Sequence, residues 1–430
     1  MSFKSERYLK SEFGIDDSII KISNMAEKEI EERFKEIDSV KEYNQLKVIK
    51  AMQNHNLSDS HFSGTTGYGY GDRGREILDG VYADTFKTED ALVRHQIVSG
   101  TQALALAMFG NLRPGDELLS VTGKPYDTLE EVIGIRGEGG GSLKEFGITY
   151  NQVDLLLDGE IDLNGIREKI NEKTKMVLLQ RSRGYCWRPS IKIDEIGKVV
   201  NHIKSIRSDI IVLVDNCYGE FVEDREPTEA GADLTAGSLI KNPGGGLAPT
   251  GGYIAGKEEY VKKAAYRLTS PGLGKEVGAT LGHNRLMLQG FFLAPHVVAE
   301  SLKGAVFCSE VMRRLGMETS PKQSEKRGDI IQAVKFGNPE SLIAFCQGIQ
   351  KGSPVDAYVT PQPWDMPGYD SPVIMAAGAF IQGASIELSA DAPIKPPYIA
   401  YMQGGLVYEH VKLGVMIAVQ KMMENGIINI

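Results

Sequence analysis

The chain has 430 residues, of which 42% are hydrophobic and 24% are charged, as is ordinary for a folded protein of two or three domains. Its formal net charge of -9, with no block of basic residues, argues against a nucleic-acid partner and against binding to an anionic membrane surface. The sequence contains no internal repeat and no low-complexity segment.

The cysteines, the histidines and the first residues give no sign of export, of a membrane anchor or of a dedicated metal site. The four cysteines lie far apart without a Cys-x-x-Cys pair, and the seven histidines have no metal-binding spacing. The first residues are charged, and no apolar run approaches the roughly 20 residues that a membrane span needs. We therefore expect a cytoplasmic protein with no membrane partner.

Residues 16–55 place apolar side chains at helical spacing between charged ones. The expected buried stripe consists of Ile19, Ile20, Ile22, Met25, Ile30, Phe34 and Ile37. We predict that residues 1–64 form an N-terminal helical arm. Such an arm packs on a neighbouring domain or subunit or, equally well, braces its own chain.

Between residues 90 and 256, short apolar runs alternate with helical patterns and glycine turns. The runs are 91–98, 117–121, 176–179, 210–214 and 252–255. Because they are continuous rather than alternating, they indicate a mostly parallel sheet that is covered on both faces. We predict a large α/β domain over residues 65–305, with its functional groups at the carboxyl edge of the strands.

The C-terminal part of the sequence predicts a smaller α+β domain over residues 306–430. It follows one long predicted helix over 283–315, in which Pro295 is the place for a bend. Short strands then mix with helices over 339–349 and 405–423. The proline-rich stretch 361–372 predicts an ordered loop over a site.

Three motifs carry the chemical signal. Lys241 lies in a tract of small residues, 237–246, that holds no compensating carboxylate. Asp215 ends the apolar run 210–214, and the segment 99–101 (Ser-Gly-Thr) precedes an apolar helix. The order of these motifs along the chain is what an enzyme that depends on pyridoxal 5'-phosphate (PLP) requires.

Each motif suits one part of PLP. A lysine removed from bulk water has a lowered pKa and attaches the cofactor aldehyde as an imine, which suits Lys241. A fixed carboxylate keeps the pyridine nitrogen protonated, which suits Asp215. The phosphate needs backbone N–H groups at a helix start, where Gly100 lets the chain come close and Ser238 adds a hydroxyl. Taken singly, Lys241 could be an ordinary lysine, Asp215 a turn cap and the segment 99–101 a plain N-cap.

The chain resembles fold-type I PLP enzymes of the cysteine and methionine metabolism superfamily, and more narrowly the methionine gamma-lyase-like branch, also named aluminium resistance proteins. The segments that carry the resemblance cover most of the chain and are Thr66-Gly-Tyr-Gly-Tyr-Gly-Asp-Arg-Gly-Arg75, Ser99-Gly-Thr-Gln-Ala103, Gln180-Arg-Ser-Arg-Gly-Tyr185, Val214-Asp-Asn-Cys-Tyr-Gly-Glu220, Ser238-Leu-Ile-Lys-Asn-Pro-Gly-Gly245 and Gln403-Gly-Gly-Leu-Val-Tyr-Glu-His410. The resemblance implies the fold-type I architecture, with a mostly parallel large domain and a smaller C-terminal domain.

The same resemblance implies a role for each candidate site residue. Lys241 would attach the cofactor, Asp215 would pair with the ring nitrogen, and Tyr126 would stack on the ring and could protonate the leaving sulfur. The phosphate would be held by Gly100, Thr101, Gln102 and Ser238, joined from the partner subunit by Tyr70 and Arg73. For two of these assignments an alternative stays open. Tyr126 could be an ordinary tyrosine in a turn. The glycine-rich segment 64–74 could be a surface loop with solvated arginines.

One departure concerns the substrate carboxylate. Members of the superfamily commonly bind it with an arginine of the C-terminal domain, yet this chain has no arginine after Arg327. Lys395 could replace that arginine as a point charge, without its planar, bidentate geometry. Arg181 and Arg183, which follow a predicted strand, are alternatives, and they could equally form structural ion pairs.

The resemblance implies a PLP-dependent carbon-sulfur lyase that acts on a sulfur-containing amino acid such as methionine, cystathionine or cysteine. Lys241 would take the Cα proton, and elimination would follow at Cβ or Cγ. The same motifs would serve an aminotransferase or a γ-replacement synthase, and a PLP-binding protein without robust turnover is an alternative of another class. A nucleotide-binding role for 244–246 is disfavoured, because the tract lacks a P-loop ending. We expect a homo-oligomer, either a dimer or a dimer of dimers (a homotetramer).

Overall fold

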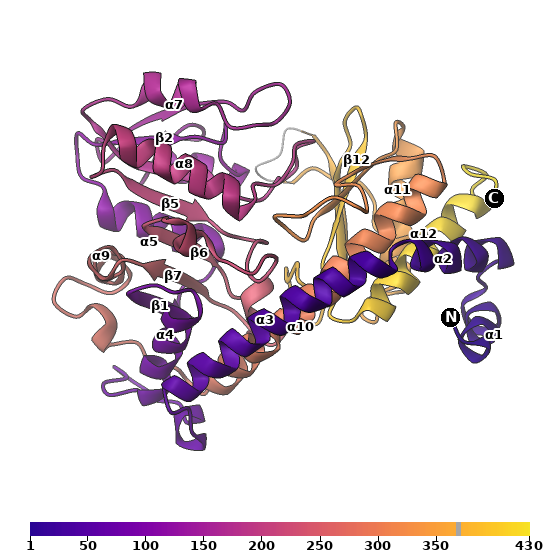
Figure 1. Cartoon of the computed structure of the whole chain (residues 1–430), viewed down its shortest axis with the longest axis horizontal. Helices are drawn as coiled ribbons and strands as arrows, with labels where there is room; N and C mark the ends of the chain where they lie inside the picture. The colour runs from indigo at the N-terminus through magenta and orange to yellow at the C-terminus, as the bar shows by residue number, and fades with distance from the viewer. Residues whose placement is uncertain (367–370) are drawn as a thin grey trace. The chain divides into compact units, whose positions relative to one another are not determined.

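The computed structural model describes residues 1–366 and 371–430, and the chain forms two compact units (Figure 1). The large unit consists of Tyr43–Gly184 and Ser190–Pro295, and the small unit of Met1–Glu42, Tyr185–Pro189 and His296–Ile430. We expected divisions after residues 64 and 305. The observed ones fall instead inside two long helices, α3 (Glu31–Asn54) and α10 (Asn284–Arg314).

The large unit contains a seven-stranded sheet in the order β1-β7-β6-β5-β4-β2-β3. Its strands are β1 (Asp90–Arg94), β2 (Glu117–Ser120), β3 (Thr149–Gln152), β4 (Thr174–Gln180), β5 (Ile211–Asp215), β6 (Leu234–Ser238) and β7 (Gly252–Gly256). Strand β7 is antiparallel to both β1 and β6, whereas the other neighbouring strands are parallel. The prediction of a mostly parallel sheet is therefore confirmed. Strand β3 was not predicted, because this edge strand is a polar, half-exposed run.

Both faces of this sheet are covered, as the continuous apolar runs predicted. Ile211 and Leu213 of β5 pack into one hydrophobic cluster, and Val212 and Val214 into another, because successive side chains of a strand point to opposite faces. The first cluster includes residues of α5 (Gly100–Asn111) and α9 (Glu258–Leu268), and the second includes residues of α8 (Ile193–Ile206) (Figure 1). The remaining helices of the large unit are α4 (Arg73–Thr85), α6 (Asp127–Ile133), α7 (Leu163–Lys169) and the 3-10 helices η1 (Asp59–Phe62), η2 (Pro227–Ala230), η3 (Asn242–Gly244) and η4 (Gly274–Glu276).

The register of the central strands sets the position of the candidate site. Asp215 lies between Gln180 of β4 and Ala236 of β6, and all three strands run in the same direction. Their carboxyl ends therefore meet at one edge of the sheet. Ser238, the last residue of β6, lies at that edge as well.

The small unit contains a five-stranded antiparallel sheet in the order β10-β11-β12-β9-β8. Its elements are β8 (Glu318–Ser320), β9 (Gln332–Lys335), β10 (Val373–Ala377), β11 (Ser389–Pro393), β12 (Ile399–Gln403), α11 (Pro339–Lys351) and α12 (Tyr408–Glu424), with α1 (Phe3–Phe13) and α2 (Asp17–Glu29) from the N-terminus. The expected α+β composition is confirmed. The predicted loop over 361–372 falls partly outside the described residues, and Trp364 before that gap forms a bridge with Val373 after it.

Over residues 19–30 the N-terminal helices bury a stripe that differs from the expected one at two positions, where Ser23 and Ala26 are buried in place of Ile22 and Met25. Ile19, Ser23, Ala26 and Ile30 are buried and follow each other at intervals of three or four residues, the spacing of one helix face. Met25 was expected in this stripe, but it is 47% exposed. The prediction for Met25 is wrong because that position lies about 100° around the helix from Ala26.

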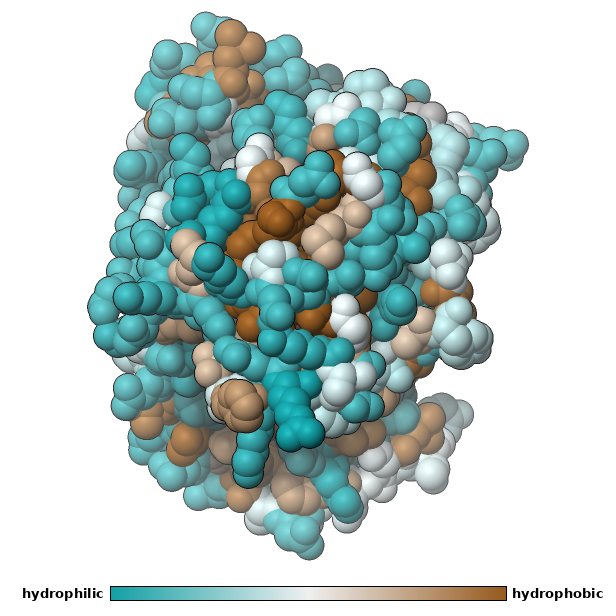
Figure 2. All heavy atoms as spheres, turned by 90° about the vertical axis from the view of Figure 1, so that its right-hand side faces the viewer, coloured by the Kyte–Doolittle hydropathy of each residue, from teal (hydrophilic) through white to brown (hydrophobic). Residues whose placement is uncertain are grey.

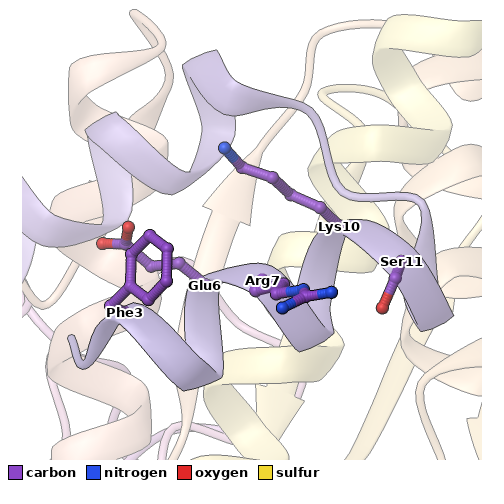
Figure 3. A pocket seen from close by; sticks show the side chains of 5 residues that line it. All are labelled: Phe3, Glu6, Arg7, Lys10 and Ser11. Carbon is purple, nitrogen blue, oxygen red and sulfur yellow. The ribbon is translucent and has the colours of Figure 1, made fainter.

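Helix α1 has no buried residue and carries a hollow lined by Phe3, Glu6, Arg7, Lys10 and Ser11 (Figure 3). Asn24 donates a hydrogen bond of 2.9 Å to Glu6, and Lys10 pairs with Asp17, so both polar contacts tie α1 to α2. The face of the molecule in Figure 2 is mostly hydrophilic, with hydrophobic side chains gathered near its middle.

In the described part of the chain, α10 is the one helix long and apolar enough to span a membrane by length and composition. The expectation that no apolar stretch approaches that length is therefore wrong. However, 72% of the most apolar window of α10 is buried inside the protein, which is typical of a core helix.

Candidate active site

Lys241 lies in a tight turn at the end of β6. The turn is closed by a hydrogen bond of 3.2 Å from the Gly244 N–H to the Lys241 carbonyl oxygen. A Cβ atom at Gly244 would lie 1.7 Å from the Leu239 carbonyl oxygen, so only glycine fits there. The backbone of the turn is therefore sterically restricted. It holds the half-buried Lys241 side chain at the carboxyl edge of the sheet.

Asp215 ends β5 and is almost fully buried, with 7% of its surface exposed. The Cys217 N–H donates a hydrogen bond of 3.1 Å to Oδ1 of Asp215. Burial raises the pKa of the Asp215 carboxyl, although the nearby Lys241 ammonium and the Cys217 donors oppose the shift. A cation close to this carboxylate would offset the cost of burying its charge.

Helix α5 begins directly beside these two strand ends. A Cβ atom at Gly100 would lie 3.1 Å from the Cys217 Sγ and 3.3 Å from the Ser238 Cβ. The absence of a side chain at Gly100 thus lets the positive end of the helix come close to both strands, where it would favour a phosphate group. Thr101 in the first turn shares a hydrogen bond of 2.7 Å with Thr128 of α6.

Gln102 is engaged in the helix cap. Its backbone N–H donates a hydrogen bond of 3.1 Å to the Ser99 Oγ, and its side-chain oxygen accepts one of 2.7 Å from the Val98 N–H. The plain N-cap that the sequence left open is therefore present. The predicted phosphate role of Gln102 stays a prediction, as do those of Gly100, Thr101 and Ser238.

Tyr126 occupies the N-cap position of α6 and is half-buried. Its ring carbon Cδ2 lies 3.8 Å from the place that a Cβ atom on Gly184 would take, and the Gln180 amide lies 3.3 Å from the same place. Tyr126 therefore lies near the end of β4, at the edge that also carries Asp215. Its stacking on a cofactor ring stays a prediction.

Two residues beside Asp215 were missed as site residues. Cys217 approaches Gly100, and the Tyr218 ring lies under Lys241, whose Nζ atom is 4.0 Å from the ring centroid. Both belong to the segment 214–220 that carried the resemblance. Their position directly after a strand-terminal aspartate is the signal that could have identified them.

The pKa of Lys241 differs from the expectation. Burial lowers the pKa of the Lys241 ammonium, whereas Cys217, Tyr218 and Asp215 raise it, and the raising effects win. The prediction of a lowered pKa for Lys241 is therefore wrong when only the protein's own side chains surround it. The tract around Lys241 holds no carboxylate, but the fold brings the Asp215 carboxylate from the neighbouring strand.

Arg181 is a structural residue rather than a carboxylate ligand. It is fully buried, and it donates to the Asn216 side chain at 2.8 Å, to the Gly219 carbonyl oxygen at 2.7 Å and to Glu223 at 2.9 Å. These bonds use the guanidinium to hold the turn that follows Asp215. The ion-pair alternative left open by the sequence is therefore the correct one for Arg181.

Arg183 is also fully buried, and its predicted substrate role stays a prediction.

A buried polar network supports the same turn from behind. The Tyr253 hydroxyl donates a hydrogen bond of 2.8 Å to Oε1 of Glu220, and the Asn216 amide donates one of 2.9 Å to Glu226. Burial raises the pKa of Glu220 to about 8. The Asn242 amide donates to the Glu220 carbonyl oxygen at 2.9 Å, so the network joins the turn after Asp215 to the turn that carries Lys241.

The remaining candidates lie on other parts of the structure. Tyr70 is 62% exposed, with its ring centroid 5.7 Å from that of Tyr68, and Arg73 points its guanidinium at His61, 3.3 Å away. Lys395 is exposed in the turn between β11 and β12 of the small unit. The roles of these three residues stay predictions.

Taken together, the site offers the amine of Lys241, the buried carboxylate of Asp215 and the hydroxyl of Ser238. It also offers the start of α5, where Gly100 has no side chain. This set fits PLP, because the start of α5 lies directly against Ser238, so that a helix N-terminus and a hydroxyl are available to one phosphate, while Lys241 and Asp215 lie at the same sheet edge. The mostly parallel large sheet and the smaller antiparallel sheet form the two-sheet architecture of fold-type I PLP enzymes.

Comparison with known proteins gives the family. The chain belongs to the methionine gamma-lyase family, whose model matches residues 19–423. It is 57% identical over 395 residues to the protein YnbB of Bacillus subtilis (strain 168), covering 92% of this chain and 94% of that one. It is also similar to the carbon-sulfur lyase involved in aluminum resistance from Clostridium novyi NT, with 53% identity, a TM-score of 0.95 and coverage of 98% of this chain and 100% of that one.

A more distant likeness concerns the fold alone. The pyridoxal-5'-phosphate dependent protein YhfS from Escherichia coli shares 17% identity with this chain and has a TM-score of 0.61. The match covers 90% of this chain and 97% of that one. The two proteins therefore share their architecture. Their sequence identity is too low to infer the substrate or the mechanism of this chain from YhfS.

Proposed function

We propose that the protein is a PLP-dependent carbon-sulfur lyase that acts on a sulfur-containing amino acid by Cα deprotonation and β- or γ-elimination. The observation that carries the proposal is the approach of Gly100 to Ser238 and Cys217, next to Asp215 and Lys241. Membership of the methionine gamma-lyase family and the name of the Clostridium novyi relative support the reaction class.

In this proposal each part of the cofactor has a partner in the chain. Lys241 would attach it covalently, Asp215 would pair with its ring nitrogen, and Gly100, Thr101, Gln102 and Ser238 would hold its phosphate. Tyr70 and Arg73 from a second subunit complete the phosphate site. When bound, the cofactor supplies an electron sink that stabilises negative charge at the substrate Cα.

The chain's own residues then move and hold protons. Asp215, buried and fixed by the Cys217 N–H, would hold a proton on the ring nitrogen, and a positive charge there would offset the cost of burying the carboxylate. Lys241 would be the nearest base and would take the Cα proton. The Tyr126 hydroxyl donates a proton to the leaving sulfur.

Product analysis tests the reaction class. Purified protein is incubated with methionine, cystathionine or cysteine, and the release of a 2-oxo acid together with a thiol or sulfide is measured. We expect stoichiometric release from at least one of these substrates. Transfer of the amino group to an added 2-oxo acid would favour the aminotransferase instead, and binding of cofactor without any product would favour the non-catalytic alternative.

We further propose a cytoplasmic homo-oligomer, either a dimer or a dimer of dimers. All four cysteines are free, which suits a reducing compartment, and Tyr68 and Tyr70 are 75% and 62% exposed on a glycine-rich segment. Light scattering of the purified protein gives the number of copies. A monomer that binds PLP fully would contradict the sharing of a site between subunits.

A further inference from the structure

The turn after β5 contains two bulky residues in the left-handed backbone region. Tyr218 has a φ of 72° and Phe221 a φ of 62°. Such angles are costly for aromatic residues and persist only where the surroundings impose them. The positions of these two side chains therefore require an explanation.

Hydrogen bonds fix the backbone of this turn at several points. The Asn216 N–H donates to the Ala236 carbonyl oxygen at 3.0 Å, the Gly219 N–H to the Asn216 carbonyl oxygen at 2.8 Å, and the Phe221 N–H to Glu226 at 2.9 Å. Arg181 adds its bond to the Gly219 carbonyl oxygen. The turn is thus rigid, and the direction of the Tyr218 side chain is determined by it.

The two aromatic residues have different surroundings. Phe221 is 2% exposed and packs against Phe86 and Phe291, with ring centroids 5.8 and 5.4 Å away, so core packing explains it. Tyr218 is only half-buried, and its ring face lies 4.0 Å from the Lys241 Nζ. Core packing therefore explains Tyr218 less well than contact with the lysine does.

The titratable groups that face Lys241 come from β5 and the turn that follows it. They are Asp215, Cys217, Tyr218 and Glu220. Under the proposed function, Asp215 is committed to the ring nitrogen and cannot also neutralise an ammonium at Lys241. Glu220 is engaged with Tyr253 behind the turn. An aromatic ring face attracts a cation without adding a second negative charge that would compete with Asp215.

On this geometry, and resting on the proposed function, we propose that Tyr218 is a positioning residue for Lys241. Its ring face holds the lysine as an ammonium beside Asp215 whenever the side chain is detached from the cofactor. Lys241 becomes an ammonium when it has taken the Cα proton, and the ring stabilises that state and keeps the amine in place for its return.

The experiment measures how pH controls the attachment of PLP to Lys241 in the full chain, first freed of cofactor. In this reaction the neutral amine attacks the cofactor aldehyde, a C=N bond forms and the carbonyl oxygen leaves as water, so the acid limb of the rate profile reports the deprotonation of Lys241. The variants are Tyr218→Asn, which removes the ring and tolerates the left-handed backbone, and the control Tyr218→Phe, which keeps the ring.

We expect the acid limb of Tyr218→Asn to move to lower pH by about half a unit or more, because its ammonium has lost the ring. Tyr218→Phe keeps the ring and loses only the hydroxyl, which also raises the pKa of Lys241, so its acid limb should move less than that of Tyr218→Asn. An unshifted profile for Tyr218→Asn would overturn the inference, and so would a Tyr218→Phe profile that matches Tyr218→Asn. If Tyr218→Asn does not fold, Tyr218→Leu replaces it under the same criteria.

The outcome for the unaltered protein separates this inference from the proposed function. Borohydride reduction and peptide mapping identify the lysine that carries PLP. A label on another lysine, or none, refutes the proposed function itself. If the label is on Lys241 and the pH profile of PLP attachment is the same in the variants at position 218, only the role of Tyr218 is refuted.

Discussion

The side-chain amide of Asn242 donates a hydrogen bond of 2.9 Å to the backbone carbonyl oxygen of Glu220, and this bond joins the turn that carries Lys241 to the turn that follows Asp215. Asn242 is fully buried. Lys241 and Asp215 thus lie at the ends of separate strands, and the Asn242 side chain links the turns that follow those strands.

Removal of this link should cost stability. Asn242→Ala leaves the buried Glu220 carbonyl oxygen without its donor, so we expect the free energy of unfolding to fall by about 1 to 3 kcal/mol. Urea unfolding of the full chain measures it. The matched control is Asn425→Ala, near the C-terminus and outside the site; an equal loss in both variants would contradict the special role of Asn242.

Replacement of the proposed attachment lysine should abolish covalent binding. Lys241→Ala is expected to form no borohydride-stable adduct with PLP and to lose activity by at least about 100-fold. Peptide mass mapping detects the adduct. Lys257→Ala, which removes one of the two lysine partners of Asp233 at the opposite end of the strands, serves as control and should keep both adduct and turnover. An adduct that persists in Lys241→Ala would place the cofactor elsewhere.

The proposed electron-sink role depends on the charge of Asp215. Asp215→Asn keeps the shape of the side chain but cannot hold the ring nitrogen in its protonated form. We expect it to bind PLP and to lose about 100-fold in kcat. Steady-state kinetics and the visible absorbance of the bound cofactor separate the two effects, and near-normal turnover would exclude this role.

A methyl group at Gly100 should weaken the hold on the phosphate. The added Cβ of Gly100→Ala would lie 3.1 Å from the Cys217 Sγ and 3.3 Å from the Ser238 Cβ, so the start of α5 must move away. We expect about tenfold weaker binding of PLP. Pyridoxal, which lacks the phosphate, should bind as before.

The control for this variant is Gly197→Ala in α8. There the new Cβ would lie 3.6 Å from the nearest atom, which is an ordinary contact. Equal losses of PLP and pyridoxal affinity in Gly100→Ala would indicate a general disturbance rather than a phosphate site.

The buried Glu220 should make stability depend on pH. Burial raises its pKa from 4.5 to about 8 in the folded protein, so the folded state holds a proton that the unfolded state has released. The stability contributed by this group is fully present below about pH 4.5 and is lost as the pH rises towards 8, by at most about 1.4 kcal/mol per pH unit.

Glu220→Gln, which mimics the protonated acid, should flatten this decline in urea unfolding measured between pH 5 and 8. The exposed Glu172→Gln is the control and should leave the curve unchanged. A wild-type slope in Glu220→Gln would show that Glu220 is ionised in the folded protein throughout this range.

The sequence was informative where one physical signal dominates. The continuous apolar runs predicted the parallel strands, because a strand covered on both faces has no polar side. The motif order identified the Lys241 turn, the end of β5 and the start of α5, which the fold does bring to one edge.

The errors arose where the outcome depends on neighbours in space. Arg181 follows a strand end as a catalytic arginine would, and only its bonds to Asn216 and Glu223 reveal that it is structural. The raised pKa of Lys241 depends on Cys217, Tyr218 and Asp215, whose distance in sequence concealed their proximity. Tyr218 went unnoticed because a left-handed backbone angle has no signature in a tyrosine.

The turn at Gly244 has a consequence for the evolution of this protein. Its backbone passes so close to Leu239 that every amino acid with a side chain is excluded, although residue 244 contributes no reactive group. A substitution at residue 244 should therefore be tolerated no better than one at the proposed attachment lysine three residues earlier. An invariant glycine at position 244 would reflect the close approach of the Leu239 backbone and not a part in the reaction.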